Sequence, residues 1–206
     1  MPTLAVKIND LTPEHIKILE YFNLPKKTIN LESLLLLKAI LSLKANGTAI
    51  LVTSAGFLFT STAVEKDVRK LIANKYLQAV IQLPNMYYGT NVSVVALVLT
   101  KEKTTDNVMF IDISTNNYFN FVDKSNRTVT NLTDAGITKV KEIYQNSEVI
   151  EGISKMVSVN EIKKFDYLLS PSKYIEVKSE RKTMSNDEID KQLNVLYERL
   201  GKTINY

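Results

Sequence analysis

The chain has 206 residues, of which 45% are hydrophobic and 23% charged, and its formal net charge is +4. These values are typical of a globular protein with one core and argue against a mainly disordered chain. The absence of cysteine excludes disulfides and cysteine-based zinc sites. No apolar run is long enough to span a bilayer and the first residues lack a signal-peptide pattern, so we expect a cytoplasmic protein.

The first 44 residues predict two helices. In the first, Thr12 is expected to cap the start, with Pro13 at the first helical position, and Pro25 to end it. The second is expected from Leu31 to Lys44 after a cap at Asn30. Its apolar residues cover most of its circumference, which predicts a buried helix, and Gly47 fits a C-terminal cap.

The next segments alternate between strand and helix patterns. Residues 48–54 form a short apolar run that predicts a strand buried on both faces, as in a parallel sheet. A helix over 63–75, with its charged residues mostly away from its apolar side, leads to a strand over 77–83. Further strands are expected over 92–100 and 107–113. This alternation predicts an α/β fold. Since the 83–92 connection is too short for a crossover helix, its flanking strands must be antiparallel.

The remainder of the chain is more polar. Thr133–Tyr144 is predicted as a helix, and Ser158–Glu161 fits a helix-capping box. Residues 176–186 resemble a linker. Beyond it, apolar residues at spacings of four, three and four predict an amphipathic helix: Ile189, Leu193, Leu196 and Leu200. Two interpretations remain open, because this helix can pack on its own domain or dock to a partner.

An ordered set of short motifs runs through residues 31–175. Its members are Gly47–Thr53, Gly56–Phe59, Glu65–Leu71, Leu77–Pro84, Tyr88–Asn91, Val94–Leu99, Val108–Asp112 and the stretch 156–175. In this order they resemble the C-terminal half of the modification (M) subunit of type I restriction-modification systems, which are DNA adenine-N6 methyltransferases. Each motif alone is weak, whereas the ordered set is specific.

The resemblance implies a Rossmann-like methyltransferase sheet and a domain plan. Residues 48–54 would be the fifth strand, 77–83 the sixth and 92–100 an antiparallel seventh strand. The implied parts are a helical lead-in (1–30), a partial methyltransferase domain (31–115), a family-specific extension (116–175) and a linker with an amphipathic helix (176–206).

The resemblance also places the pocket for the target adenine at the loop after Pro84. Its residues are Asn85, Tyr87, Tyr88, Gly89, Thr90 and Asn91. An enzyme that modifies a base extrudes it from the duplex, and aromatic faces can stack on it while amides and hydroxyls bond its edge. The alternative is a polar hairpin loop whose tyrosines cover the end of the sheet.

Two motifs of the family are absent from this sequence. The methyl donor, S-adenosylmethionine, needs a glycine-rich turn after a strand, but all six glycines here are isolated. The catalytic Asn-Pro-Pro-Phe/Tyr motif is also missing, because the chain has no Pro-Pro pair. We therefore expect no catalytic, donor-binding or metal residues in this chain, and no donor binding by the chain alone. His15, the only histidine, lacks partners for catalysis and is expected at the surface.

The family context implies partners. These are the specificity (S) subunit, an N-terminal M half or a second copy, and DNA within the assembled complex. The alternative function is a non-enzymatic interaction module that binds an S subunit or a full-length M subunit. A fifth strand without its neighbour would leave an open sheet edge, so we expect residues 1–30, a second copy or a separate polypeptide to cover it.

Overall fold

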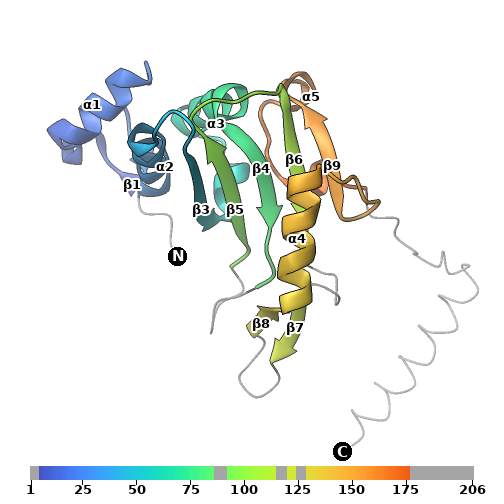
Figure 1. The fold of residues 1–206 in the computed structure, drawn as a ribbon. Coiled ribbons are helices and arrows are strands. Elements are labelled where there is room, and N and C mark those ends of the chain that lie inside the picture. Colours follow the sequence, from blue (N-terminus) through green and yellow to red (C-terminus); the bar gives the residue numbers. More distant parts are fainter. Residues whose placement is uncertain (1–4, 86–91, 115–119, 124–128, 177–206) are drawn as a thin grey trace, which may run out of the picture.

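The computed structural model describes residues 5–85, 92–114, 120–123 and 129–176 (Figure 1). The helices are α1 (Pro13–Tyr21), α2 (Leu31–Ser42), α3 (Ala63–Lys75), α4 (Asp134–Asn146) and α5 (Val159–Lys164). The strands are β1 (Ala5–Val6), β2 (Ile29–Asn30), β3 (Thr48–Ser54), β4 (Leu77–Gln82), β5 (Val94–Thr100), β6 (Asn107–Asp112), β7 (Asn120–Asp123), β8 (Val129–Leu132) and β9 (Ser154–Ser158). No helix in these ranges is long and apolar enough to cross a bilayer.

The main sheet has the strand order β3-β5-β4-β6-β9. Strand β5 is antiparallel to both β3 and β4, while β6 runs parallel to β4 and β9 antiparallel to β6. β3, β4 and β6 therefore share one direction, and β5 is a reversed strand inserted between two of them. This confirms the predicted α/β class and the predicted antiparallel strand. The pairs β1-β2 and β7-β8 form separate two-stranded sheets.

Each face of the sheet has its own core. On one face, residues of α1, α2, α3 and α5 pack with alternate strand residues such as Val80, Leu97 and Phe110. On the other face, α4 packs through Ile143 against Ala96 and Ile111. Figure 1 shows α4 in front of β6, with α3 behind the sheet. All seven residues of β5 are buried, as expected for a central strand covered on both faces.

The prediction that residues 48–54 are buried on both faces is wrong. Ile50 is 69% and Val52 51% exposed, whereas Ala49 and Leu51 on the opposite face are half-buried. Ile50 and Val52 are exposed because β3 forms an edge of the sheet. Ile50 and Val52 point to the face that α4 covers, but the core around α4 does not extend to β3.

Helix α2 is less buried and shorter than predicted. It ends at Ser42, and Leu35 is 50% exposed, while Leu36 and Leu37 are buried.

Gly47 is not a helix cap. Its N–H donates to the Lys44 carbonyl oxygen at 2.8 Å, and a Cβ at this position would lie 2.9 Å from that oxygen. A close backbone approach in a turn therefore requires glycine here.

The start of α1 confirms the predicted cap at Thr12. The Thr12 hydroxyl accepts a hydrogen bond from the His15 N–H at 3.2 Å, and the Thr12 N–H donates to His15 Nδ1 at 3.3 Å. His15 thus completes a capping box in place of the usual Glu or Gln. The helix ends before Pro25, because Asn23 takes a left-handed conformation with a φ of 53°.

The later residues join the same sheet. The helix predicted from Thr133 is confirmed as α4, and the Thr133 hydroxyl accepts a hydrogen bond from the Gly136 N–H at its start. Of the capping box predicted at Ser158–Glu161, the structure shows the bond from the Glu161 N–H to the Ser158 hydroxyl. Strand β9 extends the main sheet beyond β6, and Leu169 and Tyr174 belong to the larger core. The predicted C-terminal seam, Ile189, Leu193, Leu196 and Leu200, lies outside the described residues.

Helix α3 carries two buried charged residues where a polar side was predicted. Glu65 is 1% and Arg69 3% exposed. Arg69 donates from Nε to the Tyr167 carbonyl at 3.1 Å and from Nη1 to the Phe57 carbonyl at 3.0 Å. Glu65 accepts hydrogen bonds from the Asn30 N–H at 2.8 Å and from the Ser33 hydroxyl. Burial lowers the pKa of Arg69, while the charge of Glu65 opposes this shift. Glu65 thus ties α3 to the start of α2, and Arg69 ties it to the segments at Phe57 and Tyr167.

Candidate functional site

The parallel strands bring polar residues to one end of the sheet. Ser54 ends β3, Asn85 follows β4, and Asp112 ends β6, where it accepts hydrogen bonds from the Ser114 N–H and hydroxyl. In open α/β sheets, ligands bind beyond the carboxyl ends of the strands. This end is therefore the candidate site.

The loop predicted to hold the target base begins and ends at this site. The Leu83 N–H donates to the Val94 carbonyl at 3.0 Å, and Gln82 Nε2 donates to the same oxygen at 3.1 Å. These bonds hold the two ends of the loop together. Asn85 is half-buried beside the buried Pro84. The other predicted pocket residues, Tyr87, Tyr88, Gly89, Thr90 and Asn91, lie outside the described residues, so the base pocket stays a prediction.

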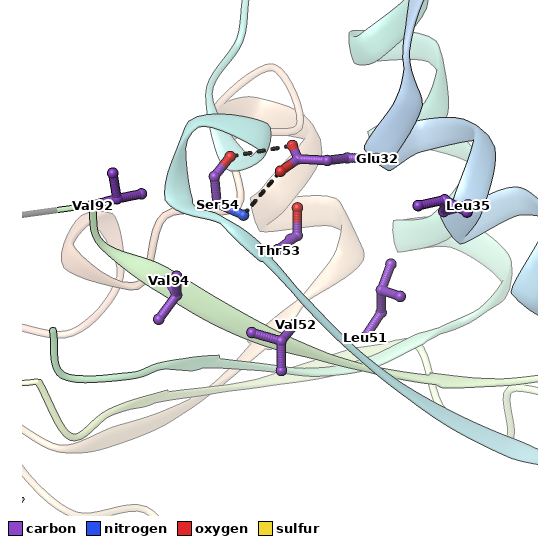
Figure 2. Close-up of a pocket in the computed structure, with 8 residues that line it drawn as sticks. All are labelled: Glu32, Leu35, Leu51, Val52, Thr53, Ser54, Val92 and Val94. Atoms are coloured by element: carbon purple, nitrogen blue, oxygen red, sulfur yellow. Dashed lines mark hydrogen bonds between the residues drawn. The ribbon is translucent and has the colours of Figure 1, made fainter. Parts of the chain in front are cut away.

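A pocket of about 110 Å³ lies at the end of β3 (Figure 2). It is formed by the first turns of α2, the last residues of β3 and the start of β5. The lining residues are Glu32, Leu35, Leu51, Val52, Thr53, Ser54, Val92 and Val94. Most of these side chains are apolar, and the polar groups come from Glu32, Thr53 and Ser54.

The carboxylate of Glu32 closes the polar end of the pocket. It accepts hydrogen bonds from the Ser54 N–H at 3.3 Å and from the Ser54 hydroxyl at 3.2 Å, as Figure 2 shows. Glu32 lies in the first turn of α2, where a negative charge is favoured by the helix dipole. The helix and the strand end are thus fixed to each other by one side chain.

Thr53 adds an unsatisfied group to the pocket. It is 6% exposed, and its hydroxyl oxygen has no hydrogen-bond partner among the described residues. In Figure 2 this oxygen is turned toward the side of the pocket where Glu32 lies. A buried hydroxyl without a partner costs free energy, because folding removes its hydrogen bonds to water. Pockets for small-molecule ligands measure about 300–1,000 Å³, so this one has room for a single side chain.

The residues present do not fit the methyl donor of the family. No strand in the described ranges is followed by a glycine-rich turn into a helix, the element that receives such nucleotide-like ligands. Gly56 lies in a short 3₁₀ helix after β3, and Gly152, with a φ of 72°, lies in a turn before β9. We therefore derive no chemical step through S-adenosylmethionine on this chain. No cluster of metal-ligating residues occurs in the part of the chain that the structure describes.

We expect Thr53→Val to raise the free energy of unfolding by about 1 kcal/mol, because it removes a buried hydroxyl without a partner and keeps the side-chain shape. Urea unfolding followed by circular dichroism measures this change. Thr100→Val is the matched control, since Thr100 is also 6% exposed but its hydroxyl bonds the Gly47 and Glu102 carbonyls. This control should lose stability. Equal losses in both variants would contradict the interpretation of Thr53.

A reversed strand between two parallel strands, with helices on both faces, agrees with the Rossmann-like methyltransferase sheet that the resemblance implied. The profile of the N-6 DNA Methylase family matches residues 10–183. The chain belongs to this family. The MpnII methylase subunit of a Mycoplasma pneumoniae type I restriction enzyme is 32% identical over 167 residues, 76% of this chain and 30% of that subunit. The MjaVII methylase subunit of Methanocaldococcus jannaschii is 33% identical over 131 residues, 61% of this chain and 22% of that subunit.

A solved structure agrees with these matches. The type I restriction-modification methyltransferase subunit from Streptococcus thermophilus superposes with a TM-score of 0.64 at 29% identity. The match covers 74% of this chain and 31% of that subunit. The predicted resemblance to type I M subunits is therefore confirmed. The chain spans less than a third of the length of each of these relatives.

The sequence interpretation missed Glu32 and Thr53. Glu32 has the appearance of an ordinary acidic residue at the start of a helix, and Thr53 that of an ordinary strand residue. Their shared pocket depends on how α2 packs beside β3, for which the sequence carries no local signal. Ser54 also lies in this pocket, and its N–H donates to the Glu32 carboxylate there.

Proposed function

We propose that this chain supplies part of a type I M subunit, the adenine-N6 DNA methyltransferase of a cytoplasmic restriction-modification complex. The observation that carries the proposal is the family match over residues 10–183, in a sequence without the donor-binding turn and without a Pro-Pro pair. The chain would act with a polypeptide that provides both motifs and would transfer no methyl group alone.

Within such a complex, the loop after Pro84 would border the extruded adenine. Its ends are held at the carboxyl end of the sheet by the bonds to the Val94 carbonyl, which suits a loop that must present side chains at a fixed place. Tyr87 and Tyr88 would stack on the base, and Asn85 would bond its edge. The C-terminal seam at Ile189, Leu193, Leu196 and Leu200 would dock to the S subunit, which reads the DNA sequence.

Mixing experiments test this proposal. The chain is combined with the part of the MpnII methylase subunit that it does not match, together with a type I S subunit. Transfer of a tritiated methyl group from S-adenosylmethionine to adenine in unmethylated genomic DNA is then measured. We expect transfer only in the full mixture. Adenine methylation by the chain alone, or none in any mixture that forms a complex, would overturn the proposal.

The second candidate is a non-enzymatic module that binds an S subunit or a full-length M subunit. The exposed apolar edge at Ile50 and Val52 favours it, since monomers rarely leave such strands uncovered. Purification with the S subunit but not with the complementing M segment, and inhibition of a full-length methylase, would support this second candidate over the first.

A further inference from the structure

We propose that, in the chain without an S subunit, the C-terminal apolar seam packs into a groove on the outer side of helix α3. The seam consists of Ile189, Leu193, Leu196 and Leu200. An S subunit would then compete with the groove for these residues. This competition rests on the function proposed above, whereas the groove and its match to the seam rest on the described residues and on the sequence.

The groove runs along the side of α3 that faces away from the sheet, since Val68 and Ile72 on the other side belong to the core. Counting from Asp67, its lining residues on α3 follow after three, four, seven and eight positions, which is one helical stripe: Lys70, Leu71, Asn74 and Lys75. One rim is the loop after α1, at Phe22–Leu24, and the other is the loop after α5, at Tyr167. The groove measures about 490 Å³, so it has room for several side chains of a docked helix.

Both rims contain a residue in a conformation that non-glycine residues seldom adopt. The φ angle is 53° at Asn23 and 57° at Tyr167. On the first rim, the Leu24 N–H donates to the Leu19 carbonyl at 2.8 Å, and on the second, Arg69 Nε donates to the Tyr167 carbonyl at 3.1 Å. Such conformations persist where the surrounding structure fixes them, and they are frequent at ligand clamps. The rims are thus fixed before anything docks between them.

The groove combines an apolar floor with charged groups that lack ion-pair partners. Leu24 and Leu71 are half-buried in it, and the buried Tyr167 adds an apolar wall. Lys70 and Lys75 are exposed, and neither forms an ion pair with any residue that the structure describes. An apolar floor with positive edges favours an acidic amphipathic helix. The phosphate backbone of DNA would match the charges but offers no apolar side chains for the floor.

The seam has this chemistry. On the predicted helix, Glu188 and Asp190 flank the apolar residues at the start, and Arg199 flanks them near the end. The charges also match in spacing, because Asp67 and Lys75 lie about 12 Å apart along α3, and Asp190 and Arg199 would lie about 14 Å apart. A seam helix antiparallel to α3 would therefore bring Asp190 to the lysines and Arg199 to Asp67.

The linker before the seam is long enough for this placement. The described residues end at Glu176, and the hydroxyl of Tyr174 donates to the carbonyl of Leu168, the residue after Tyr167 on the rim, at 2.5 Å. When extended, residues 177–186 span about 33 Å, so they reach either end of the groove. A tether of this kind keeps the seam at an effective concentration on the order of a millimolar, which favours the groove of the same chain over that of a second copy.

Disulfide crosslinking in the full chain tests the placement, because the chain has no cysteine of its own. One double variant carries Asn74→Cys in the groove and Gln192→Cys beside the seam. The matched control combines the same Gln192→Cys with Gln145→Cys, an exposed position of α4 on the other face of the sheet. Under a mild oxidant, the groove pair should form an intramolecular disulfide at least tenfold faster than the control pair, measured by non-reducing electrophoresis.

Charge reversal in the Asn74–Gln192 pair tests the orientation. Lys75→Glu should slow the crosslink several-fold because it repels the acidic start of the seam, and Asp190→Lys in the same chain should restore the rate. Lys141→Glu on α4 changes the net charge equally at an exposed position, and it should leave the rate unchanged. If both lysine variants slow the crosslink equally, the assigned charge pairing is wrong.

The outcomes separate this inference from the proposed function. Equal rates for the groove pair and the control pair overturn the inference. Disulfide-linked dimers without an intramolecular product would assign the groove to the seam of a second copy and overturn the choice of occupant. An added type I S subunit should slow the crosslink. If the S subunit binds the chain without slowing it, the seam is not its docking surface, which contradicts that part of the proposed function and leaves the groove standing.

Discussion

Replacing Arg69 with methionine should lower the free energy of unfolding by about 3 kcal/mol. The guanidinium is buried and bonds the carbonyls of Phe57 and Tyr167, which belong to segments far apart in the sequence. Its removal leaves two buried carbonyls without this donor and leaves the buried Glu65 without its nearby positive charge. Losing one member of such an arrangement is among the few single changes that cost this much.

Thermal unfolding followed by circular dichroism measures the effect, and a chain of this size should lose roughly 10 °C in Tm. Lys70→Met is the matched control, because Lys70 follows Arg69 directly on α3 but is exposed. Its Tm should change little. Arg69→Lys should give an intermediate loss, since lysine keeps the charge but cannot bond both carbonyls as the guanidinium fork does. Similar Tm values for the Arg69 and Lys70 methionine variants would show that the buried contacts contribute nothing.

Calorimetric titration of S-adenosylmethionine into the purified chain should show no binding heat up to millimolar donor. The reason is the absence of a glycine-rich turn after any described strand and of any Pro-Pro pair in the sequence. The full-length MpnII methylase subunit is the positive control for the same titration.

A one-to-one isotherm for the chain alone would mean that it builds a donor site from other residues. This result would contradict the proposal that another polypeptide provides the donor-binding motif. Adding the complementing segment to the chain should restore binding. If the segment binds the donor equally well without the chain, the donor site lies wholly in the segment, which agrees with the proposed function.

Much of the fold could be predicted from local patterns. Helix starts followed from Thr12, Thr133 and Ser158, whose side chains bond backbone N–H groups regardless of distant packing. The antiparallel direction of β5 relative to β4 followed from the shortness of the 83–92 connection, and its inserted position followed from the family resemblance. These features depend on residues close in the sequence, which is why a single sequence carries them.

Burial at the edge and inside α3 could not be predicted in the same way. Ile50 and Val52 have the residue types of a buried strand, but only the position of β3 in the sheet decides that they are exposed. Arg69 has the appearance of a surface residue, but it donates hydrogen bonds inside the protein to the carbonyls of Phe57 and Tyr167, which are distant in the sequence. Such burial depends on tertiary partners, which spacing along the chain does not encode.

The candidate site also has one part that the sequence predicted and one part that it did not. The chemistry of the loop after Pro84 was predicted from the aromatic and amide residues and from the family, and of these residues the structure describes Asn85. The pocket of Glu32 and Thr53 was not predicted, because its residues come from two elements whose packing alone brings them together.

The inserted position of β5 also constrains how the chain folds during synthesis. Among the strands that the structure describes, β3 pairs with β5 alone, from Ser54 with Val94 to Thr48 with Thr100, and not with β4, the strand that follows it in the chain. On the ribosome, β3 and α3 emerge long before the strand that completes their layer. Non-local pairing of this kind slows folding and leaves apolar strands exposed to aggregation. In a nascent chain of this protein, the pairing of β3 with β5 therefore cannot be completed until Thr100 has left the exit tunnel.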